Sequence, residues 1–578
     1  CGHQHCIGSI DEMNSLKTED SPTPKELHRP YVDDVKLCCT AEGCSGEMIR
    51  EPYVMDCWFD SGCASFAQWH YPFENKEKFE NSFPVDYICE AVDQTRGWFY
   101  SLLAVSTTVF DNISYKRCLS LGHILDNEGK KMSKSRGNVV NPWDHFNKEG
   151  TDAIRWYMTS QSAPWNPMNF DPNGVRETYA KMFLTLWNVH KFHLDYAILD
   201  NFDYSKDFIP VDKRNALDRW ILSRISSVAE NYHDQYVSWE FHKAARELEN
   251  FVINDLSNWY VRRSRRRLWD EAESHDKRAC QFTLHEVLLT VSKLMAPIAP
   301  FMPDKIHFDL TGTSVHTADW PLGSDLVDKN LPPQDLGLEK EMSIVRMLAE
   351  TGRKIRVEAK RRQRLPCKEG WIVGGPDLSE FHSIIAEELN VENLTTENNL
   401  DRFQKIEVLP NHKVLGAKCR ADLPKVLSEL SQLDPDSLLS DIEKGTAKLA
   451  GFEITSEDIN IKRVEKEGYA ASTFEVEETG DISLVLDVEI TDDLVSKGLA
   501  REITRRIQSK RKELDLDLEA SISLKVWLEL DSPKLNEDDW QYIISETRSK
   551  PSELIIGNPE KDLDNFQVEN NKIYFKVN

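Results

Sequence analysis

The feature that most constrains the fold of this chain is a long stretch, from about residue 175 to residue 310, in which apolar residues recur at helical spacing. One apolar stripe begins at Phe183 and another at Leu217. Such stripes become buried when antiparallel helices joined by short loops pack against one another. The stretch therefore predicts a helix bundle, and the proline-rich run at 297–303 predicts the end of one of its helices.

Different patterns flank the helical stretch. Before it, residues 118–125 are typical of a strand and a polar turn, and residues 141–160 of a helix that Asn141 caps and Pro142 begins. After it, helical runs alternate with β-rich stretches at 482–490 and 520–530. We therefore expect a multidomain protein with an α/β domain at residues 1–172, an all-α domain at 173–330 and an α+β region at 331–578.

Composition narrows the classes of function. The chain has 578 residues and a net charge of −26, from 71 Lys and Arg against 97 Asp and Glu. This balance disfavours indiscriminate nucleic-acid binding, so a polyanion partner would need local basic patches. The chain has no run of 18 apolar residues, so no membrane partner is expected. Twelve cysteines without a secretion signal indicate reduced thiols in the cytoplasm, some of them binding metal.

The strongest motif is a lysine loop, Lys131-Met132-Ser133-Lys134-Ser135, preceded by the string Leu121-Gly122-His123-Ile124-Leu125. A buried strand leads into a turn, and a loop with clustered cations follows. Such cations suit a nucleotide triphosphate, because they can neutralise charge that grows on the α-phosphate under attack and on the departing pyrophosphate. The alternative is a hairpin whose lysines are merely solvated.

A second group of residues has the spacing of one helix face: Glu90, Asp93, Gln94, Gly97 and Trp98. Gly97 would cost about 1 kcal/mol relative to Ala inside a helix, so we expect another group to approach the backbone closely there. Carboxylates and amides suit an amino group and ribose hydroxyls. The alternative is an ordinary solvated face.

Cysteine pairs predict a metal site near the start of the chain. Cys1 and Cys6 are separated by four residues, as are Cys39 and Cys44. Spacing of two to four residues within a pair is compatible with structural zinc. The pairs can equally be free thiols.

Two basic runs stand out in this acidic chain. Five arginines occupy six positions from Arg262 to Arg267, directly after Asn258-Trp259-Tyr260-Val261. Arg263, Arg266 and Arg267 share a helix face by their spacing, and a second cluster lies at 353–364. Basic residues beside aromatic residues suit RNA phosphates and unstacked bases, whereas the alternative for each run is a solvated face.

Several of these strings carry a family resemblance. The lysine loop, continued by Arg136-Gly137-Asn138, resembles the signature loop of class I aminoacyl-tRNA synthetases. The string at 93–100, Asp-Gln-Thr-Arg-Gly-Trp-Phe-Tyr, resembles the isoleucyl-tRNA synthetases, although bacterial members usually have Gly where this chain has Ala91. The string Asp56-Cys57-Trp58-Phe59-Asp60-Ser61-Gly62 resembles another segment of that family. The arginine run at 262–267 resembles part of the helical anticodon-binding domain of the isoleucine, valine and leucine enzymes.

The resemblance implies a role for each group. Lys131 and Lys134 would stabilise the phosphoryl transition state, and Trp58 and Trp98 would flank the isoleucine side chain. ATP with Mg²⁺ would be a substrate, and tRNA(Ile) and isoleucine the other partners. The ATP or adenylate site would comprise Glu90, Asp93, Gln94, His123, Met132, Ser133 and Ser135. The tRNA contacts would be Arg262, Arg263, Arg266 and Arg267, and the zinc ligands Cys1, Cys39 and Cys44, with Cys6 as a further candidate.

The resemblance also implies an incomplete enzyme. It is to isoleucyl-tRNA synthetases of the archaeal or eukaryotic-cytosolic kind, expected to be monomeric. Residues 1–172 would be the second half of the Rossmann-like catalytic domain, with a zinc segment at 1–50. The His-Ile-Gly-His type motif of the first half does not occur in the 578 residues, and the chain begins at Cys1, so we expect a C-terminal fragment without the editing domain. The alternatives are a valine or leucine enzyme, or a non-catalytic tRNA-binding protein derived from a synthetase.

Overall fold

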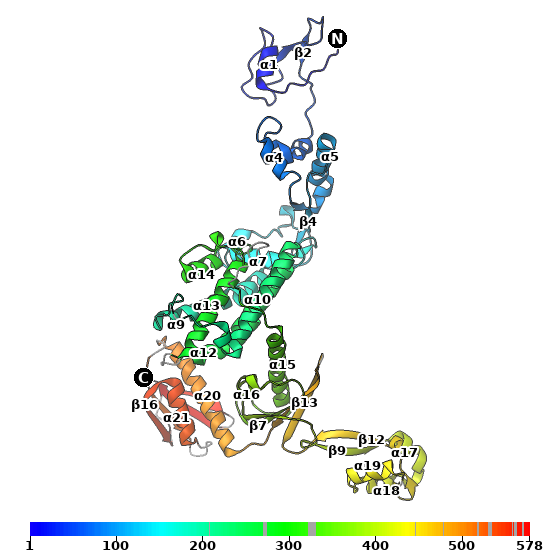
Figure 1. Ribbon diagram of the computed structural model, residues 1–578, viewed down its shortest axis with the longest axis vertical. Helices are drawn as coiled ribbons and strands as arrows, with labels where there is room; N and C mark the ends of the chain where they lie inside the picture. Colours follow the sequence, from blue (N-terminus) through cyan, green and yellow to red (C-terminus); the bar gives the residue numbers. More distant parts are fainter. Residues whose placement is uncertain are drawn as a thin grey trace. The chain divides into compact units, whose positions relative to one another are not determined.

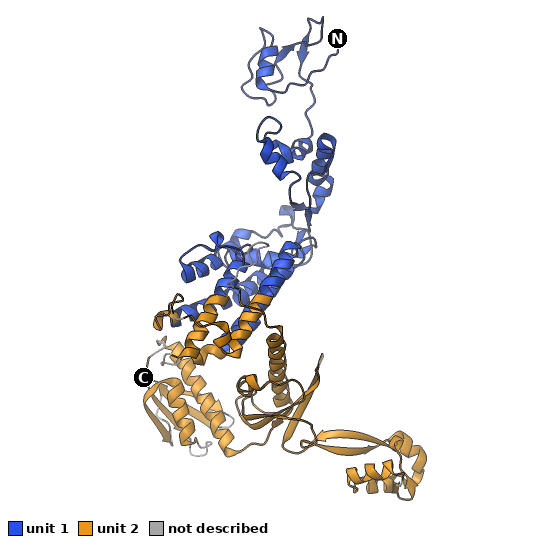
Figure 2. Ribbon diagram, viewed as in Figure 1, with its two compact units in different colours: residues 1–196, 228–262, 288–328 blue, residues 197–227, 263–287, 329–578 orange. Residues whose placement is uncertain are grey.

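The computed structural model describes residues 1–206, 208–269, 274–321, 331–445, 447–477, 479–516, 520–529, 535–557, 559, 563–568 and 571–577. The chain forms two compact units (Figure 2). One comprises residues 1–196, 228–262 and 288–328, and the other residues 197–227, 263–287 and 329–578. The division passes through four helices of the predicted bundle, in one case directly after the helix's first residue. The predicted boundary between residues 330 and 331 lies at the edge of 322–330, outside the described residues.

The N-terminal module of the first unit is a short hairpin with one helix. Strands β1 (Lys36–Cys38) and β2 (Glu47–Ile49) pair antiparallel, with Cys38 opposite Glu47. Helix α1 (Ile10–Leu16) begins after Ser9, whose hydroxyl accepts a hydrogen bond from the Glu12 amide. The hairpin turn carries Cys39 and Cys44.

A parallel strand pair follows in the same unit. Strands β3 (Ile88–Ala91) and β4 (Cys118–Leu121) run parallel, joined by the 3₁₀-helix η1 (Val92–Arg96) and helix α5 (Trp98–Phe110). Helix α2 (Cys57–Gly62) packs closely on α5 because Gly62 lacks a side chain: a Cβ there would lie 2.8 Å from the Ser101 carbonyl oxygen. A crossover helix between parallel strands is the unit of α/β folds, as predicted.

A second short parallel pair joins β5 (Ile124–Leu125) and β6 (Met168–Asn169), with the lysine loop between them in sequence. Asn141 caps the following helix as predicted, through a 3.2 Å bond from the Trp143 amide. The predicted single helix at 141–160 is wrong: α6 (Pro142–Phe146) and α7 (Thr151–Ser160) are separate. Gly150, between them, has a φ of +87°, which interrupts the helix.

The described residues between 172 and 311 form helices joined by loops, without a strand (Figure 1), as their periodicity predicts. Leu217 and Phe183 are buried, whereas Leu184 is 38% exposed. No described helix is long and apolar enough to cross a bilayer. The helices are α8 (Pro172–Thr178), α9 (Leu184–Leu199), α10 (Ala216–Val237), α11 (Phe241–Asn250), α12 (Arg262–Trp269), α13 (His275–Met295) and α14 (Met302–Thr311), with π-helical turns at Tyr179–Phe183 and Phe251–Val261.

The rest of the second unit is α+β, as predicted. After α15 (Leu336–Glu358), one sheet has the order β13-β14-β7-β8, and a ribbon of β9 and β12 carries three short helices. Its elements are β7 (Cys367–Val373), α16 (His382–Leu389), β8 (Val391–Glu397), β9 (Gln404–Pro410), α17 (His412–Cys419), α18 (Leu423–Leu430), α19 (Pro435–Glu443), β12 (Ile459–Glu465), β13 (Tyr469–Val476) and β14 (Gly480–Asp487).

A second four-stranded sheet closes the unit, in the order β16-β15-β18-β17. Its core contains Ile503 of α20 and Ile543 of α21, both fully buried. The predicted β-rich stretches at 482–490 and 520–530 correspond to β14 and β15, and Leu530 lies outside the described residues. The elements are α20 (Asp492–Glu513), β15 (Ile522–Leu528), α21 (Glu537–Thr547), β16 (Ser549–Ile556), β17 (Asp564–Val568) and β18 (Asn571–Val577).

Candidate active site and metal centre

The strand that leads to the lysine loop is fixed by a close backbone approach. The Gly122 amide donates to the Pro164 carbonyl over 2.9 Å, and the His123 carbonyl accepts from the Met168 amide, also over 2.9 Å. A Cβ on Gly122 would lie 2.2 Å from the Asn166 carbonyl oxygen. Only glycine therefore lets the two segments meet here, and the exposed residue His123 follows directly.

The lysine loop is held by a buried carboxylate. Asp126, 9% exposed, accepts from the Lys130 amide over 2.8 Å and from Asn138 Nδ2 over 2.7 Å. Asn138 Oδ1 in turn accepts from the Ser133 amide over 2.9 Å. The hydrogen bond from Asn138, and next the one from the Lys130 amide, lower the pKa of Asp126. Both ends of the loop are thus held by the hydrogen-bonded pair of Asp126 and Asn138. The sequence indicated only that Asp126 lies in a turn and that Asn138 extends the motif.

Within this frame the loop presents its cations outward. Lys131 bridges to Leu125 through its backbone, and Lys134 begins the 3₁₀-helix η2 (Lys134–Arg136). Both lysines are exposed, as is Ser135. Met132 packs instead against the buried cluster that contains Ile154 and Met168. The loop is therefore anchored by an apolar side chain and a polar clamp, while its two lysines face solvent.

The group from Glu90 to Trp98 does not lie on one helix face, and that prediction is wrong. Glu90 is in strand β3, Asp93 and Gln94 are in η1, and α5 begins only at Trp98. Gly97 has φ −146° and ψ −113°, outside the helical region, so the helix restarts there. Glu90, Asp93 and Gln94 instead lie in β3 and directly after it. This is the same edge as His123, because β3 and β4 are parallel.

The two tryptophan strings do meet. Two groups approach Gly97: a Cβ there would lie 2.7 Å from Gln94 Oε1 and 3.2 Å from the Trp58 indole. Gln94 Oε1 accepts from the Trp98 amide over 2.9 Å, and Trp98 Nε1 donates to the Ser61 carbonyl over 3.0 Å. Trp58 is 41% exposed and so is not a core tryptophan. The arrangement places two indoles beside the amide of Gln94.

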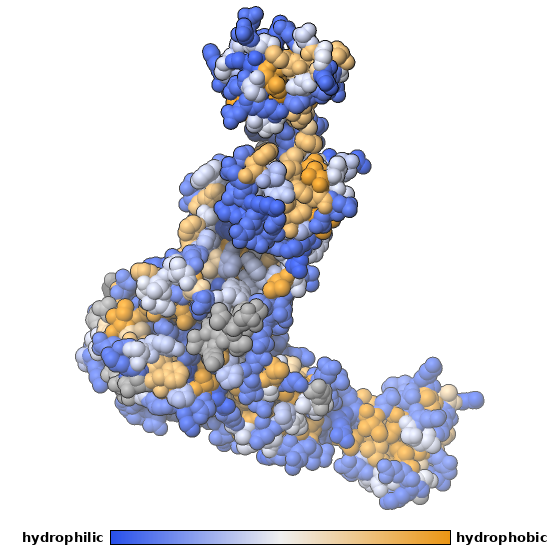
Figure 3. Space-filling model, turned by 45° about the horizontal axis from the view of Figure 1, so that its top comes forward, coloured by the Kyte–Doolittle hydropathy of each residue, from blue (hydrophilic) through white to orange (hydrophobic). Residues whose placement is uncertain are grey.

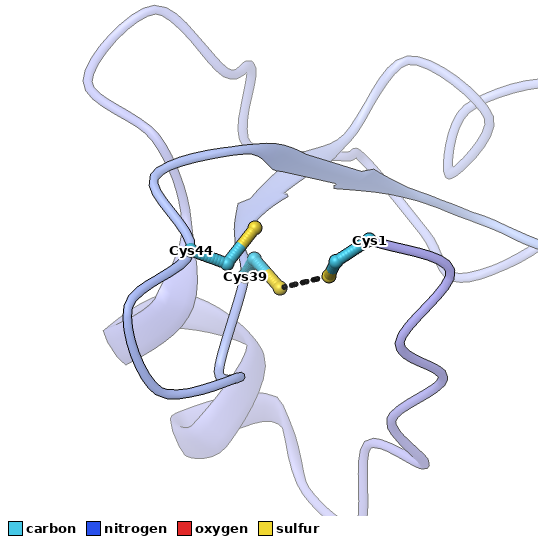
Figure 4. A group of neighbouring side chains, drawn as sticks. All are labelled: Cys1, Cys39 and Cys44. Carbon is cyan, nitrogen blue, oxygen red and sulfur yellow. Dashed lines mark hydrogen bonds between the residues drawn. The ribbon is translucent and has the colours of Figure 1, made fainter.

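Three cysteines of the N-terminal module converge (Figure 4). The sulfurs of Cys1, Cys39 and Cys44 all lie within 4.8 Å of one another, with 3.6 Å between Cys1 and Cys39. Tetrahedral zinc, with Zn–S bonds of about 2.3 Å, needs sulfurs about 3.8 Å apart. The Gly46 backbone, and next the Cys39 side chain, lower the pKa of Cys44, which favours the thiolate that a metal requires. These three residues fit a zinc ion, whereas Cys6 is not part of the group, contrary to its candidacy.

Two arginines of the run form ion pairs with carboxylates of the chain itself, which the sequence did not predict. Arg263, with a side chain 5% exposed, pairs with Glu387 and with Glu388. Arg267 donates to Asp218 over 2.6 Å and to Asp276. Ion pairs of this kind occupy these two guanidinium groups, so a contact of Arg263 or Arg267 with tRNA, which stays a prediction, would compete with carboxylates of the chain itself.

The other two predicted tRNA contacts remain at the surface. Arg266 pairs with Glu546 while its side chain stays 69% exposed. Arg262 is exposed, with its guanidinium 5.9 Å from the centre of the Trp259 ring. Arg262 and Arg266 therefore keep the exposure that a phosphate contact requires.

Comparisons with known proteins agree with these features. The family "tRNA synthetases class I (I, L, M and V)" matches residues 1–171, and "Anticodon-binding domain of tRNA ligase" matches residues 218–370. Isoleucine--tRNA ligase 2 of a Bacillus cereus strain is 40% identical over 533 residues, covering 91% of this chain and 50% of the relative. Isoleucine--tRNA ligase of Clostridium acetobutylicum is 40% identical over 542 residues, with the same coverage. The chain spans about half the length of the curated relatives it matches.

One solved structure has a weaker likeness. The methionyl-tRNA synthetase of Mycobacterium tuberculosis in complex with methionyl-adenylate is 21% identical, with a TM-score of 0.40, over 50% of this chain and 56% of that chain. At this TM-score the likeness supports no conclusion about the fold.

Proposed function

We propose that this chain belongs to the isoleucyl-tRNA synthetases of class I and carries half of an active site that joins isoleucine to ATP and transfers it to tRNA(Ile). The site needs no nucleophilic side chain, because positioning and charge stabilisation can supply the rate. Lys131 and Lys134, on a loop whose ends are clamped by Asp126 and Asn138, would stabilise charge on the α-phosphate and the departing pyrophosphate of ATP–Mg²⁺. Met132, Ser133 and Ser135 would shape this side of the nucleotide site.

The adenylate would lie along the carboxyl edge of β3 and β4, where parallel sheets bind ligands. Glu90, Asp93 and Gln94 would accept hydrogen bonds from an ammonium group and ribose hydroxyls, and His123 would line the nucleotide site. Trp58 and Trp98 would wall the pocket for the branched side chain, since indoles offer a large, rigid apolar surface.

The metal centre has a structural part in this proposal. Cys1, Cys39 and Cys44 would hold zinc, which would cross-link the start of the chain to the β1–β2 hairpin. A module with so few buried residues gains much of its folding free energy from such a link. The N-terminal module would then present a fixed surface to the rest of the enzyme.

The helical region would grip tRNA(Ile), with Arg262 and Arg266 as phosphate contacts at its surface. A chain of net charge −26 needs such local patches to hold RNA. We place the enzyme in the cytoplasm as a monomer, in line with its cysteine content and its substrates.

The lysine loop is the observation that carries this proposal, because its clamp leaves two lysines exposed beside the strand edge. The test is aminoacylation by a protein that joins residues 1–578 to a first nucleotide-binding half. We expect isoleucine, rather than valine or leucine, to be charged onto its tRNA. Lys134→Ala should lower the adenylation rate by roughly 100- to 1000-fold with isoleucine affinity nearly unchanged, because the lysine acts on charge that develops in the transition state.

Exposed Lys148 provides the matched control, since Lys148→Ala removes the same charge outside the loop. An unchanged turnover number in Lys134→Ala, or preferential charging of valine or leucine, would refute the assignment.

A further inference from the structure

The basic cluster at 353–364 forms one side of a cavity in the second unit. The cavity has a volume of about 630 Å³ and lies between the segment that follows α15 and helix α20. Its cationic lining residues are Lys360, Arg361, Arg362, Arg364 and Arg506. Among the described residues that line it, none is aromatic and Glu502 is the single carboxylate. The cavity is thus strongly cationic in a chain whose net charge is −26.

The basic segment is fixed in place by backbone contacts. Arg356, 1% exposed, donates to the Leu365 carbonyl over 2.7 Å, and Arg361 Nε donates to the Val488 carbonyl over 2.7 Å. A Cβ on Gly498 of α20 would lie 3.2 Å from Leu365 Cδ1, so the segment packs directly on the helix. Buried Arg356, behind the lining, and Arg361, within it, therefore hold the segment in place, and the cluster is not a loose basic tail.

Guanidinium groups outnumber carboxylates at this wall, where Arg364 and Arg506 line the cavity and Arg505 lies behind the lining on the same carboxylate. Arg364 pairs with Glu502, while Arg506 lies 3.0 Å and Arg505 3.7 Å from the same carboxylate. Glu502 has a side chain only 10% exposed, whereas the three arginine side chains are between 43% and 55% exposed. Burial, and next the neighbouring charges of Arg505 and Arg506, lower the pKa of Arg364. Three guanidinium groups share one carboxylate, so the site retains an excess positive charge that an anion would relieve.

We infer that this cavity binds consecutive backbone phosphates of tRNA, as a second RNA contact outside the helical region. The inference rests on the proposed function for the identity of the RNA. Guanidinium groups bind phosphates in a bidentate manner, and the described lining residues offer no aromatic side chain on which a base could stack, so phosphates are the favoured contact. Recognition here would therefore follow the backbone and add affinity without reading sequence.

The test is binding of fluorescently labelled tRNA(Ile) to the 578-residue chain at several KCl concentrations, read by anisotropy. The double variant Arg505→Gln and Arg506→Gln should bind roughly tenfold more weakly in low salt. Its log–log salt slope should be shallower by roughly 0.7 to 0.9 for each phosphate that the variant no longer neutralises. Arg463→Gln is the matched control, because Arg463 is exposed and lies within ion-pair distance of Asp401, outside the cavity.

Glu502→Gln separates anion binding from a structural role, because it removes the negative charge and keeps a hydrogen-bonding side chain. It should bind tRNA several-fold more tightly, the opposite of the arginine variant. Circular dichroism melts would show that each variant is folded. A folded arginine variant with the wild-type slope, or a folded Glu502→Gln that binds more weakly, would overturn the cavity assignment alone. Wild-type protein that fails to bind tRNA would instead overturn the proposed function.

Discussion

At the scale of single residues, the positions of the exposed lysines in the loop depend on two residues without positive charge, Asp126 and Asn138. Asp126 collects hydrogen bonds from one end of the loop and Asn138 from the other, and the two side chains bond to each other over 2.7 Å. Placement matters because a cation stabilises a transition state only where the charge develops. In the proposed site, Asp126 and Asn138 would therefore position Lys131 and Lys134.

Replacing the clamp should reduce turnover while leaving the lysines intact. In the joined enzyme, we expect Asn138→Ala to lower the rate of isoleucine-dependent ATP–pyrophosphate exchange by roughly 10- to 100-fold, the scale of a misplaced catalytic group. The KM for isoleucine should change little, because the amino-acid pocket lies on other elements. Asn127→Ala, at an exposed position of the same turn, is the control. Equal rates for the two variants would show that the clamp does not position the loop.

At the scale of elements, the N-terminal hairpin depends on its cysteine cluster. Elemental analysis of the chain should find about one zinc bound, and Cys39→Ser should remove it together with the cooperative melting of this module. The reason is that few buried residues hold residues 1–50: Met13 and Val35 are the buried apolar side chains among them. Cys6→Ser should keep the metal, because Cys6 is outside the cluster. Full zinc content in Cys39→Ser would rule out this site.

The helical region should be sensitive to acid through a buried histidine. His285 stacks on Tyr204 with ring centres 4.1 Å apart, and burial lowers its pKa from 6.5 to about 4. Between these values the unfolded chain binds a proton that the folded chain does not, so stability is complete above pH 6.5 and falls as the pH drops towards 4. The loss is on the order of 3 kcal/mol.

His285→Phe keeps a ring of similar size and removes the titration. We expect its unfolding midpoint in urea to fall less than that of the wild type between pH 7 and pH 4.5. Parallel pH dependence in the two proteins would show that His285 is not the titrating group.

Elements that depend on periodicity or on local capping were predictable from the sequence. The helical stretch, the cap at Asn141 and the α+β character of the C-terminal region are confirmed. The structure of the interval from Glu90 to Trp98 was not predictable. Spacing of i, i+3 and i+4 cannot reveal that Gly97 adopts non-helical backbone angles. The close approach at Gly97 was predictable, whereas the contact with Trp58, which accompanies the nearer one with Gln94, was not, because Trp58 is distant in sequence.

The arginine run shows a related limit of sequence reading. Spacing alone placed Arg263, Arg266 and Arg267 on one face, but two of the carboxylates that bind this face, those of Asp218 and Glu546, lie 49 and 280 positions away in the chain. No local pattern contains such partners. The sequence allowed candidate site residues to be named only where they form a contiguous motif, above all in the lysine loop.

At the scale of the whole molecule, the proposed RNA binding depends on local basic patches in an acidic chain. The face in Figure 3 is mainly hydrophilic, with hydrophobic residues in separate patches. A net charge of −26 repels polyanions in general, which makes attachment depend on the few places where cations gather. Arg262 and Arg266 at the helical region, and the cavity beside Glu502, are such places.

We therefore expect this chain to bind tRNA without catalysing adenylation. The regions proposed to contact tRNA lie within residues 1–578, whereas the sequence contains no His-Ile-Gly-His type motif to complete the nucleotide site. We expect the 578-residue chain to bind tRNA(Ile) in a salt-dependent manner and to show no isoleucine-dependent ATP–pyrophosphate exchange above background. Anisotropy and exchange assays on one preparation would measure both properties, with the joined enzyme as the positive control for exchange. Robust exchange by the chain alone would mean that the lysine loop, the strand edge and the two tryptophans suffice for adenylation, and that the complementary half adds affinity rather than chemistry.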